Sequence, residues 1–303
     1  MKALDLPIAF TPWQASLRLG FARMGERTAL VQREHNGPLR VQKALYPEGQ
    51  ALCQAIIVHP PGGVVAGDQL QIAVEIGIGS QVLLTTPGAA KWYKSPGPVS
   101  GQDIVIKVAE GATLEWLPQE TIFFDACQVA LNQQIELAQH ASYIGCDIVC
   151  YGRRASGEAL RSGRISQRTR ISRAGKLIWS EQGICDVAQA DSRLHSRFGM
   201  AGNTVCATLL ACPATAATEL ANGSASRAAN SLSNKQSSSL LADLRSAIAS
   251  LPGCGVTHFQ GMWVVRYLGH SSEDARQTML AAWAILRPAL LGRAAVVPRI
   301  WQT

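Results

Sequence analysis

Residues 69–76 read Gln-Leu-Gln-Ile-Ala-Val-Glu-Ile, an alternation in which every second side chain is a large aliphatic one. Successive side chains of a β-strand point to opposite faces of the sheet, so this period of two predicts a strand with one buried face. The same alternation recurs at residues 103–108, where Ile104, Ile106 and Val108 are interleaved with Asp103 and Lys107. Both segments therefore predict half-buried strands.

Similar runs recur about every 10 to 15 residues through the first two-thirds of the chain. They lie at 16–21, 28–33, 40–46, 54–59, 81–86, 112–117, 129–137, 143–151, 164–172 and 176–181. Glycine and proline turns separate them, as at Pro60-Pro-Gly-Gly63 and Pro87-Gly88. No helical pattern of useful length intervenes, so the connections are hairpins or short crossovers. The sequence predicts a mainly β fold whose multi-stranded sheets are antiparallel or coiled upon themselves.

The pattern changes in the last third of the chain. Residues 212–239 are mostly Ala, Ser, Asn and Thr with no periodic apolar face, which predicts a flexible low-complexity insertion. Leucines and Ile248 at helical spacing over 240–248 then predict a short helix that stops before Pro252-Gly253. A strand is expected at 262–267.

A second helix is expected after Ser271 or Ser272, either of which can cap its first turn. Glu273 and Asp274 follow, where negative charge suits the positive end of the helix dipole. Its apolar face comprises Met279, Leu280, Trp283 and Leu286, and its end is expected near Arg287-Pro288. The fold class is thus mainly β with two α-helices near the C-terminus.

The composition is that of a globular chain, with 47% hydrophobic and 16% charged residues. Its 303 residues leave one large domain or two smaller ones open, against a prior of about 150 residues per domain. No run approaches the roughly 18 apolar residues that a membrane helix needs, and Lys2 and Asp5 precede any apolar run. The eight cysteines form no CxxC pair and are interpreted as reduced thiols. These features predict a protein that is neither secreted nor membrane-inserted.

The net charge of +7 has a local origin in residues 151–180, where Glu158 is the single acidic residue. The basic residues there are Arg153, Arg154, Arg161, Arg164, Arg168, Arg170, Arg173 and Lys176. Such a patch can attract nucleic acid, acidic lipid or an acidic protein surface, or it can be only a solvated face of alternating strands.

The familiar catalytic motifs are missing: there is no phosphate-binding GxxxxGK[ST] loop, no GxGxxG, no HExxH and no GxSxG. A β-fold hydrolase of unknown substrate remains an alternative, because a nucleophile and its base can be brought together only in the fold. A basic nucleic-acid-binding module is the other alternative, although residues 152–178 contain no aromatic side chain for base stacking.

Three segments combine turn residues with a cation or carboxylate. They read HPPGGVVAGD (59–68), TTPGAAKWYKS (85–95) and LPQETIFFD (117–125). Paired prolines restrict one half of the first turn and paired glycines free the other, so His59 and Asp68 can be held close together at its base. The alternative for His59 is an imidazole that simply satisfies the end of a strand.

At these residues the chain resembles the UreD (UreH) family of urease accessory proteins. The resemblance includes Trp13, the three segments above, Arg154–Glu158, Trp179-Ser-Glu181, Val265-Arg-Tyr-Leu-Gly269, Leu286-Arg-Pro288, Leu291-Gly-Arg293 and the terminal Pro298–Thr303. The chain departs from the family pattern at 212–239, which looks like a longer insertion, and at Gln182, where a basic residue would follow Glu181.

The resemblance implies a cytoplasmic, non-enzymatic scaffold that forms a single domain over residues 1–303. Members of the family bind the helical accessory protein UreF, which recruits the GTPase UreG, and the assembly docks on apo-urease. They are thought to deliver nickel through an internal, water-filled passage. On this basis we expect a metallochaperone for nickel insertion, with transient Ni²⁺ and no tightly bound cofactor, and with no nucleic-acid or membrane partner.

Carboxylates should line such a passage, because oxygen ligands release a borderline cation that a closed Cys/His cage would trap. The first candidates are Asp68, Asp147 and Glu181, and the weaker ones are Glu120, Asp125, Glu158 and His59. The alternative is that these carboxylates are ion-pair partners of the nearby arginines. For the UreF surface we expect support from Trp283, Leu290, Leu291 and Trp301, unless these side chains only close the core.

Overall fold

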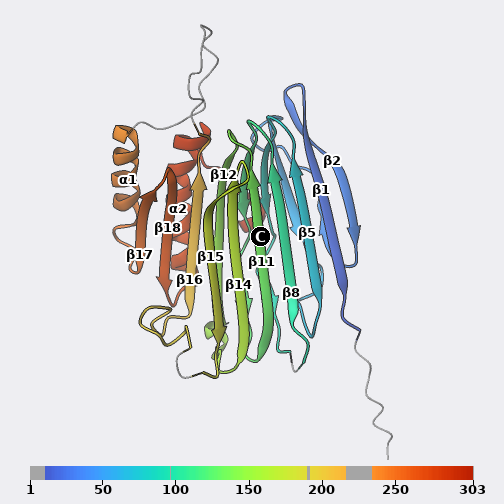
Figure 1. Cartoon of the computed structure of the whole chain (residues 1–303), viewed down its shortest axis with the longest axis vertical. Coiled ribbons are helices and arrows are strands. Elements are labelled where there is room, and N and C mark those ends of the chain that lie inside the picture. The colour runs from blue at the N-terminus through green and yellow to red at the C-terminus, as the bar shows by residue number, and fades with distance from the viewer. Residues whose placement is uncertain (1–10, 96, 190–191, 216–233, 303) are drawn as a thin grey trace, which may run out of the picture.

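The computed structural model describes residues 11–95, 97–189, 192–215 and 234–302, and consists of two large β-sheets with two helices (Figure 1). The seven-stranded sheet has the order β15 (Lys176–Asp186), β14 (Gly163–Arg173), β11 (Cys127–Leu137), β8 (Ser100–Val108), β5 (Gln69–Ile76), β1 (Gln14–Met24) and β2 (Arg27–Asn36). A mainly β fold, as predicted, is confirmed.

The eleven-stranded sheet has a main path of eight strands and three short strands beside it. The path is β17 (Cys254–Phe259), β18 (Met262–Gly269), β16 (Val205–Cys212), β12 (Ser142–Arg153), β9 (Thr113–Leu117), β6 (Gln81–Thr85), β4 (Leu52–Val58) and β3 (Arg40–Val41). The short strands are β7 (Ala90–Trp92), β10 (Thr121–Phe123) and β13 (Glu158–Ala159). The helices are α1 (Asn234–Ile248) and α2 (Ser272–Leu291), with single turns η1 (Arg154–Ser156) and η2 (Arg299–Gln302).

The chain coils between the two sheets, because consecutive long strands from β4 to β14 alternate from one sheet to the other. Neighbouring strands inside the coil are therefore parallel, as in β5–β8, β8–β11 and β6–β9. Antiparallel pairing occurs at the margins, in β1–β2, β14–β15 and the β12–β16–β18–β17 series. The expectation of coiled sheets is thus met, while antiparallel pairing is confined to places where a short turn or a return of the chain reverses its direction.

In the coil, side chains of the same kind lie next to one another on successive strands, in register. Five aliphatic side chains with almost no exposed surface form one cross-strand row from β1 to β14, namely Leu19, Val74, Ile106, Ile135 and Ile171. This row belongs to the core between the sheets. A second core lies between the eleven-stranded sheet and the helices, which sit beside β16, β17 and β18 in Figure 1. Strand β12 contributes alternate residues to both cores, which explains its nearly continuous burial.

The helices differ from their predicted limits in two ways. Helix α1 begins at Asn234, six residues before the predicted start, because a helix anchored by Leu240 and Leu244 in the second core extends at little further cost. Residues 234–239 and Cys212 are therefore regular structure, and residues 213–215 form an irregular segment after β16. The rest of the predicted insertion, 216–233, lies outside the described residues. Helix α2 starts at the predicted Ser271 cap, whose hydroxyl accepts a hydrogen bond from the Asp274 N–H at 3.0 Å.

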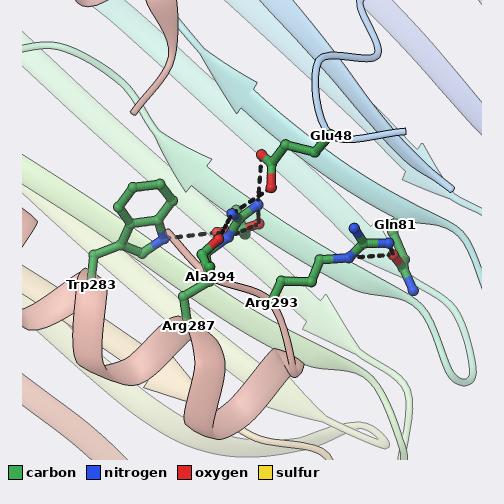
Figure 2. Close-up of polar contacts among 7 residues, drawn as sticks. Glu48, Gln81, Trp283, Arg287, Arg293 and Ala294 are labelled. Carbon is green, nitrogen blue, oxygen red and sulfur yellow. Dashed lines mark hydrogen bonds and ion pairs between the residues drawn. The ribbon is translucent and has the colours of Figure 1, made fainter. Parts of the chain in front are cut away.

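Helix α2 also continues through Pro288 to Leu291 and ends at Gly292 with φ 66°. Proline costs a helix one hydrogen bond, but the neighbouring Arg287 is fixed by a buried network that outweighs this cost (Figure 2). The Arg287 side chain is 0% exposed and donates to Glu115 on β9, to Glu48 and to the carbonyl of Ala294. The indole N–H of Trp283 donates to the same Glu115 carboxylate at 2.8 Å. This network attaches α2 and the segment that follows it to the eleven-stranded sheet.

We expect Arg287→Met to lower the free energy of unfolding by about 3–5 kcal/mol, because it leaves the Glu115 carboxylate buried without its cation. Denaturant unfolding of the purified chain measures this. Arg293→Met is the matched control: Arg293 bonds only to the Gln81 amide among described residues (Figure 2), so its loss should cost less than about 1 kcal/mol. Equal losses in the two variants would contradict this account.

Candidate functional site

On the interior face of the seven-stranded sheet, one cross-strand row of side chains changes from apolar to polar on its way from β1 to β15. The row beside the aliphatic one contains Leu17, Ile72, Ile104, Gln133, Thr169 and Glu181, in the order β1, β5, β8, β11, β14, β15. Because strand register carries each side chain to the same face as its neighbour, Glu181 points toward the space between the sheets. This part of the interior is built to be polar.

The facing row on the eleven-stranded sheet contains Asp147 on β12, Thr208 on β16 and Arg266 on β18. The guanidinium of Arg266 crosses to the other sheet and donates two hydrogen bonds to Glu181, at 3.0 Å to each carboxylate oxygen. It also lies over the Trp179 ring, 5.8 Å from its centre. The pair joins two segments singled out in the sequence, Trp179-Ser-Glu181 and Val265-Arg-Tyr-Leu-Gly269. Glu181 thus obtains its cation from β18, although Gln182 follows it in sequence.

A cavity of about 500 Å³ lies between these rows. Its charged lining comprises Asp147, Glu181, Arg168, Arg193 and Arg266. A smaller cavity of about 240 Å³ adjoins it, with Gln133, Asp147, Gln167, Arg168 and Thr169 lining both. Asp147 therefore stands where the two interior spaces meet.

Asp147 has no hydrogen-bond or ion-pair partner within the described part of the chain. Burial between the sheets, and secondarily the negative charge of Glu181, raise its pKa to about 6. The side chain is flanked by buried neighbours on β12 but keeps a large accessible surface, and it lines both cavities. An unpaired interior carboxylate of this kind is suited to hold a cation briefly.

The smaller cavity is lined mainly by apolar side chains and by His59, Trp92 and Gln119. Each of these three carries a buried side-chain nitrogen without a hydrogen-bond partner, Nε2 of His59, Nε1 of Trp92 and Nε2 of Gln119. Burial lowers the pKa of His59, although the charge of Asp68 opposes this effect. The imidazole is therefore neutral at neutral pH, the form that can bind a metal ion.

The other predicted carboxylates do not line either cavity. Asp68 is buried and accepts hydrogen bonds from the backbone N–H of Trp13 at 2.8 Å and of Val65 at 3.2 Å, which fixes the base of the 59–68 turn. Glu120 is paired with Arg276 of α2. Glu158 is paired with Arg153, one of the basic residues of 151–180.

Asp125 accepts hydrogen bonds from the backbone around it. Burial disfavours its ionised form, but hydrogen bonds from the N–H groups of Arg161, Ser162 and Ala126 outweigh this and lower its pKa. Like Asp68, Asp125 therefore has its ionised form satisfied by the surrounding backbone.

Two arginines of the larger cavity, Arg193 and Arg266, were not among the sequence candidates. A side chain at Gly183 would collide with the Arg193 guanidinium, and one at Gly199 with the Arg193 backbone carbonyl and Cγ, so both glycines are needed for the position of Arg193. The sequence signal for Arg266 was its motif, whose role only its contact with Glu181 reveals. No group of three or more His, Cys, Asp or Glu side chains is placed to hold a metal ion among residues 11–95, 97–189, 192–215 and 234–302.

The candidates for the partner surface lie in and around the second core. Trp283 and Leu290 are buried, and Leu291 and Trp301 are half-buried. The indole N–H of Trp301 donates to the Thr85 hydroxyl at 2.8 Å, which ties the terminal segment to β6. Trp283 and Leu290 are therefore covered by other side chains, while Leu291 and Trp301 keep part of their surface accessible.

We expect Asp147→Asn to stabilise the chain at pH 7.5 by about 1 kcal/mol, less than the full pKa shift would give because water screens the accessible carboxylate, and to have little effect at pH 4.5. A carboxyl with a raised pKa keeps its proton in the folded state between about pH 4 and pH 6 while the unfolded chain loses it, so folding stability falls as pH rises through this window. Urea unfolding at the two pH values measures the difference. Asp186→Asn is the control, because Asp186 lies on β15 of the facing sheet and is paired with Arg164 at 3.2 Å. An equal effect of Asp147→Asn at both pH values would refute the expectation.

The profile of the family described as UreD urease accessory protein matches residues 14–302. The urease accessory protein UreD of Janthinobacterium sp. (strain Marseille) is 49% identical over 96% of this chain and 92% of the relative. That of Dechloromonas aromatica (strain RCB) is 47% identical over 96% and 95%, and that of Nitrosococcus oceani is 44% identical over 100% and 96%. The chain therefore belongs to the UreD family of urease accessory proteins.

Proposed function

We propose that this accessory protein is a scaffold for urease maturation that relays Ni²⁺ to apo-urease through the cavities between its two sheets. Membership of the family makes it a maturation factor and not an enzyme, as the sequence resemblance implied. The same membership removes the support for a hydrolase or a nucleic-acid-binding module. The observation that supports the proposed passage is the position of Asp147, an unpaired carboxylate that lines both cavities between the sheets.

The chemistry of the lining favours transit over storage. Asp147 and Glu181 offer oxygen ligands, and His59 offers a neutral imidazole in the lining of the smaller cavity. Two or fewer ligands at any one point bind a divalent cation weakly, so that it can move on. We therefore propose transient Ni²⁺ as cargo and no tightly bound cofactor. Asp68, Glu120, Asp125 and Glu158 contribute to this route only by fixing the backbone and elements around it.

We further propose a cytoplasmic complex in which the chain binds UreF, through it UreG, and apo-urease. Among the described residues, no helix is long and apolar enough to cross a membrane. The outer side of α2 and the segment after it expose apolar side chains, with Val296 45% and Val297 41% exposed. Ala284 and Pro288 are exposed on the same helix. This surface, supported from beneath by Trp283 and Leu290, is the proposed UreF site.

Urease matured with Asp147→Asn or Glu181→Gln should contain several-fold less nickel under limiting nickel, with proportionally lower activity, because each change removes one weak ligand from the route. The double variant should be worse than either single one. Co-expression with UreF, UreG and apo-urease, followed by metal analysis of purified urease, measures this. The control is Asp186→Asn, which removes a carboxylate from β15 outside the cavities. Wild-type nickel content in the double variant would disprove the route.

The double variant Val296→Asp/Val297→Asp should reduce capture of UreF by at least about tenfold without unfolding the chain, because it places two charges in a desolvated contact. Pull-down with purified UreF, together with a melting curve, measures both effects. Val31→Asp changes a valine that is 57% exposed on β2 and should leave capture unchanged. Full binding by the folded double variant would show that UreF docks elsewhere.

A further inference from the structure

The larger cavity holds two carboxylates in contrasting states. Glu181 is held in a two-pronged ion pair with Arg266, while Asp147 has no such partner in the part of the chain that the structure describes. Asp147 and Arg266 are joined through Thr208, which lies between them in the same cross-strand row. The cation that neutralises Glu181 is therefore anchored on the sheet that carries Asp147.

We propose that Arg266 is an exchangeable counter-ion: it leaves Glu181 when a divalent cation enters the space beside Asp147, and it pairs with Glu181 again when the cation moves on. This inference rests on the proposed nickel passage and names the residue that regulates it. Arg266 is then a positioning residue that sets how long the cation stays.

The charges explain why such a residue is useful. The charged lining of the larger cavity consists of two carboxylates, Asp147 and Glu181, and three arginines, Arg168, Arg193 and Arg266. With Arg266 in place, the charge of Glu181 is neutralised by its ion pair. With Arg266 withdrawn from Glu181, both carboxylates are available to a divalent cation. Competition by Arg266 therefore weakens the bound state and promotes release, since each added positive charge near the cation costs Coulomb energy.

The geometry allows the exchange. The side chains of Arg266 and Glu181 are 46% and 30% exposed, and ion pairs that remain hydrated open at little cost. The Trp179 ring, 5.8 Å from the guanidinium carbon, offers a cation–π contact that does not depend on Glu181. This pair contrasts with that of Arg287, which is 0% exposed, bonds to two carboxylates and is structural.

The test is a titration of NiCl₂ into the purified full-length chain, combined with the rate at which a chelator removes the bound metal. Arg266→Gln should lower the Kd for Ni²⁺ by about 5- to 10-fold and slow release by a similar factor, because the competing charge is gone. Arg266→Lys keeps that charge and should stay close to wild type. Arg164→Gln breaks the comparable surface pair with Asp186 and should also behave as wild type.

Two outcomes would overturn the inference in distinguishable ways. If Asp147→Asn and Glu181→Gln weaken Ni²⁺ binding but folded Arg266→Gln binds no more tightly than wild type, the passage stands and the exchange is wrong. If neither carboxylate variant changes Ni²⁺ binding, the proposed passage fails and the role of Arg266 fails with it. A melting curve for each variant establishes that it is folded.

Discussion

In-register pairing of parallel strands is the constraint on which the rest of this structure depends. Each turn of the coil sets one strand on each sheet, so a residue's position in its strand decides the row it joins and the face it occupies. A shift of one residue in β14 would turn Thr169 outward and an arginine inward, and the same shift in β15 would turn Glu181 outward. The aliphatic row ending at Ile171 opposes that shift, and so the apolar core fixes the position of the polar cavity.

The ion pairs of Arg287 and of Arg266 show how burial distinguishes a structural pair from one that can exchange. Arg287 is removed from solvent and pairs with Glu115 and Glu48, and burial raises the pKa of Glu115. Charges in such surroundings must stay paired, because removing one partner lowers the free energy of unfolding by about 3–5 kcal/mol. Arg266 and Glu181 remain partly exposed to a cavity, where pairing is weaker and can be exchanged. The helix layer therefore stays rigid beside an interior that can respond to a cation.

The site candidates came from residue type and from the family resemblance. In the structure, Asp147 and Glu181 line the larger cavity and His59 lines the smaller one. Asp68 and Asp125 follow turns, and their carboxylates are used by nearby backbone N–H groups. A carboxylate near an apolar strand looks the same in sequence whether it meets a cavity, a cation or the backbone, because the partner comes from another part of the chain.

The sequence by itself determined most of the long strands, the N-cap of α2 and the family, because alternation, capping residues and ordered motifs are local signals. It left antiparallel and coiled sheets open, and only the tertiary structure decided that the strands coil between two sheets, since parallel pairing leaves no mark on a single strand. It also decided that α2 continues through Pro288 and that Arg266 pairs with Glu181. Both depend on contacts between residues far apart in sequence, whose energies outweigh local preference and which no local pattern records.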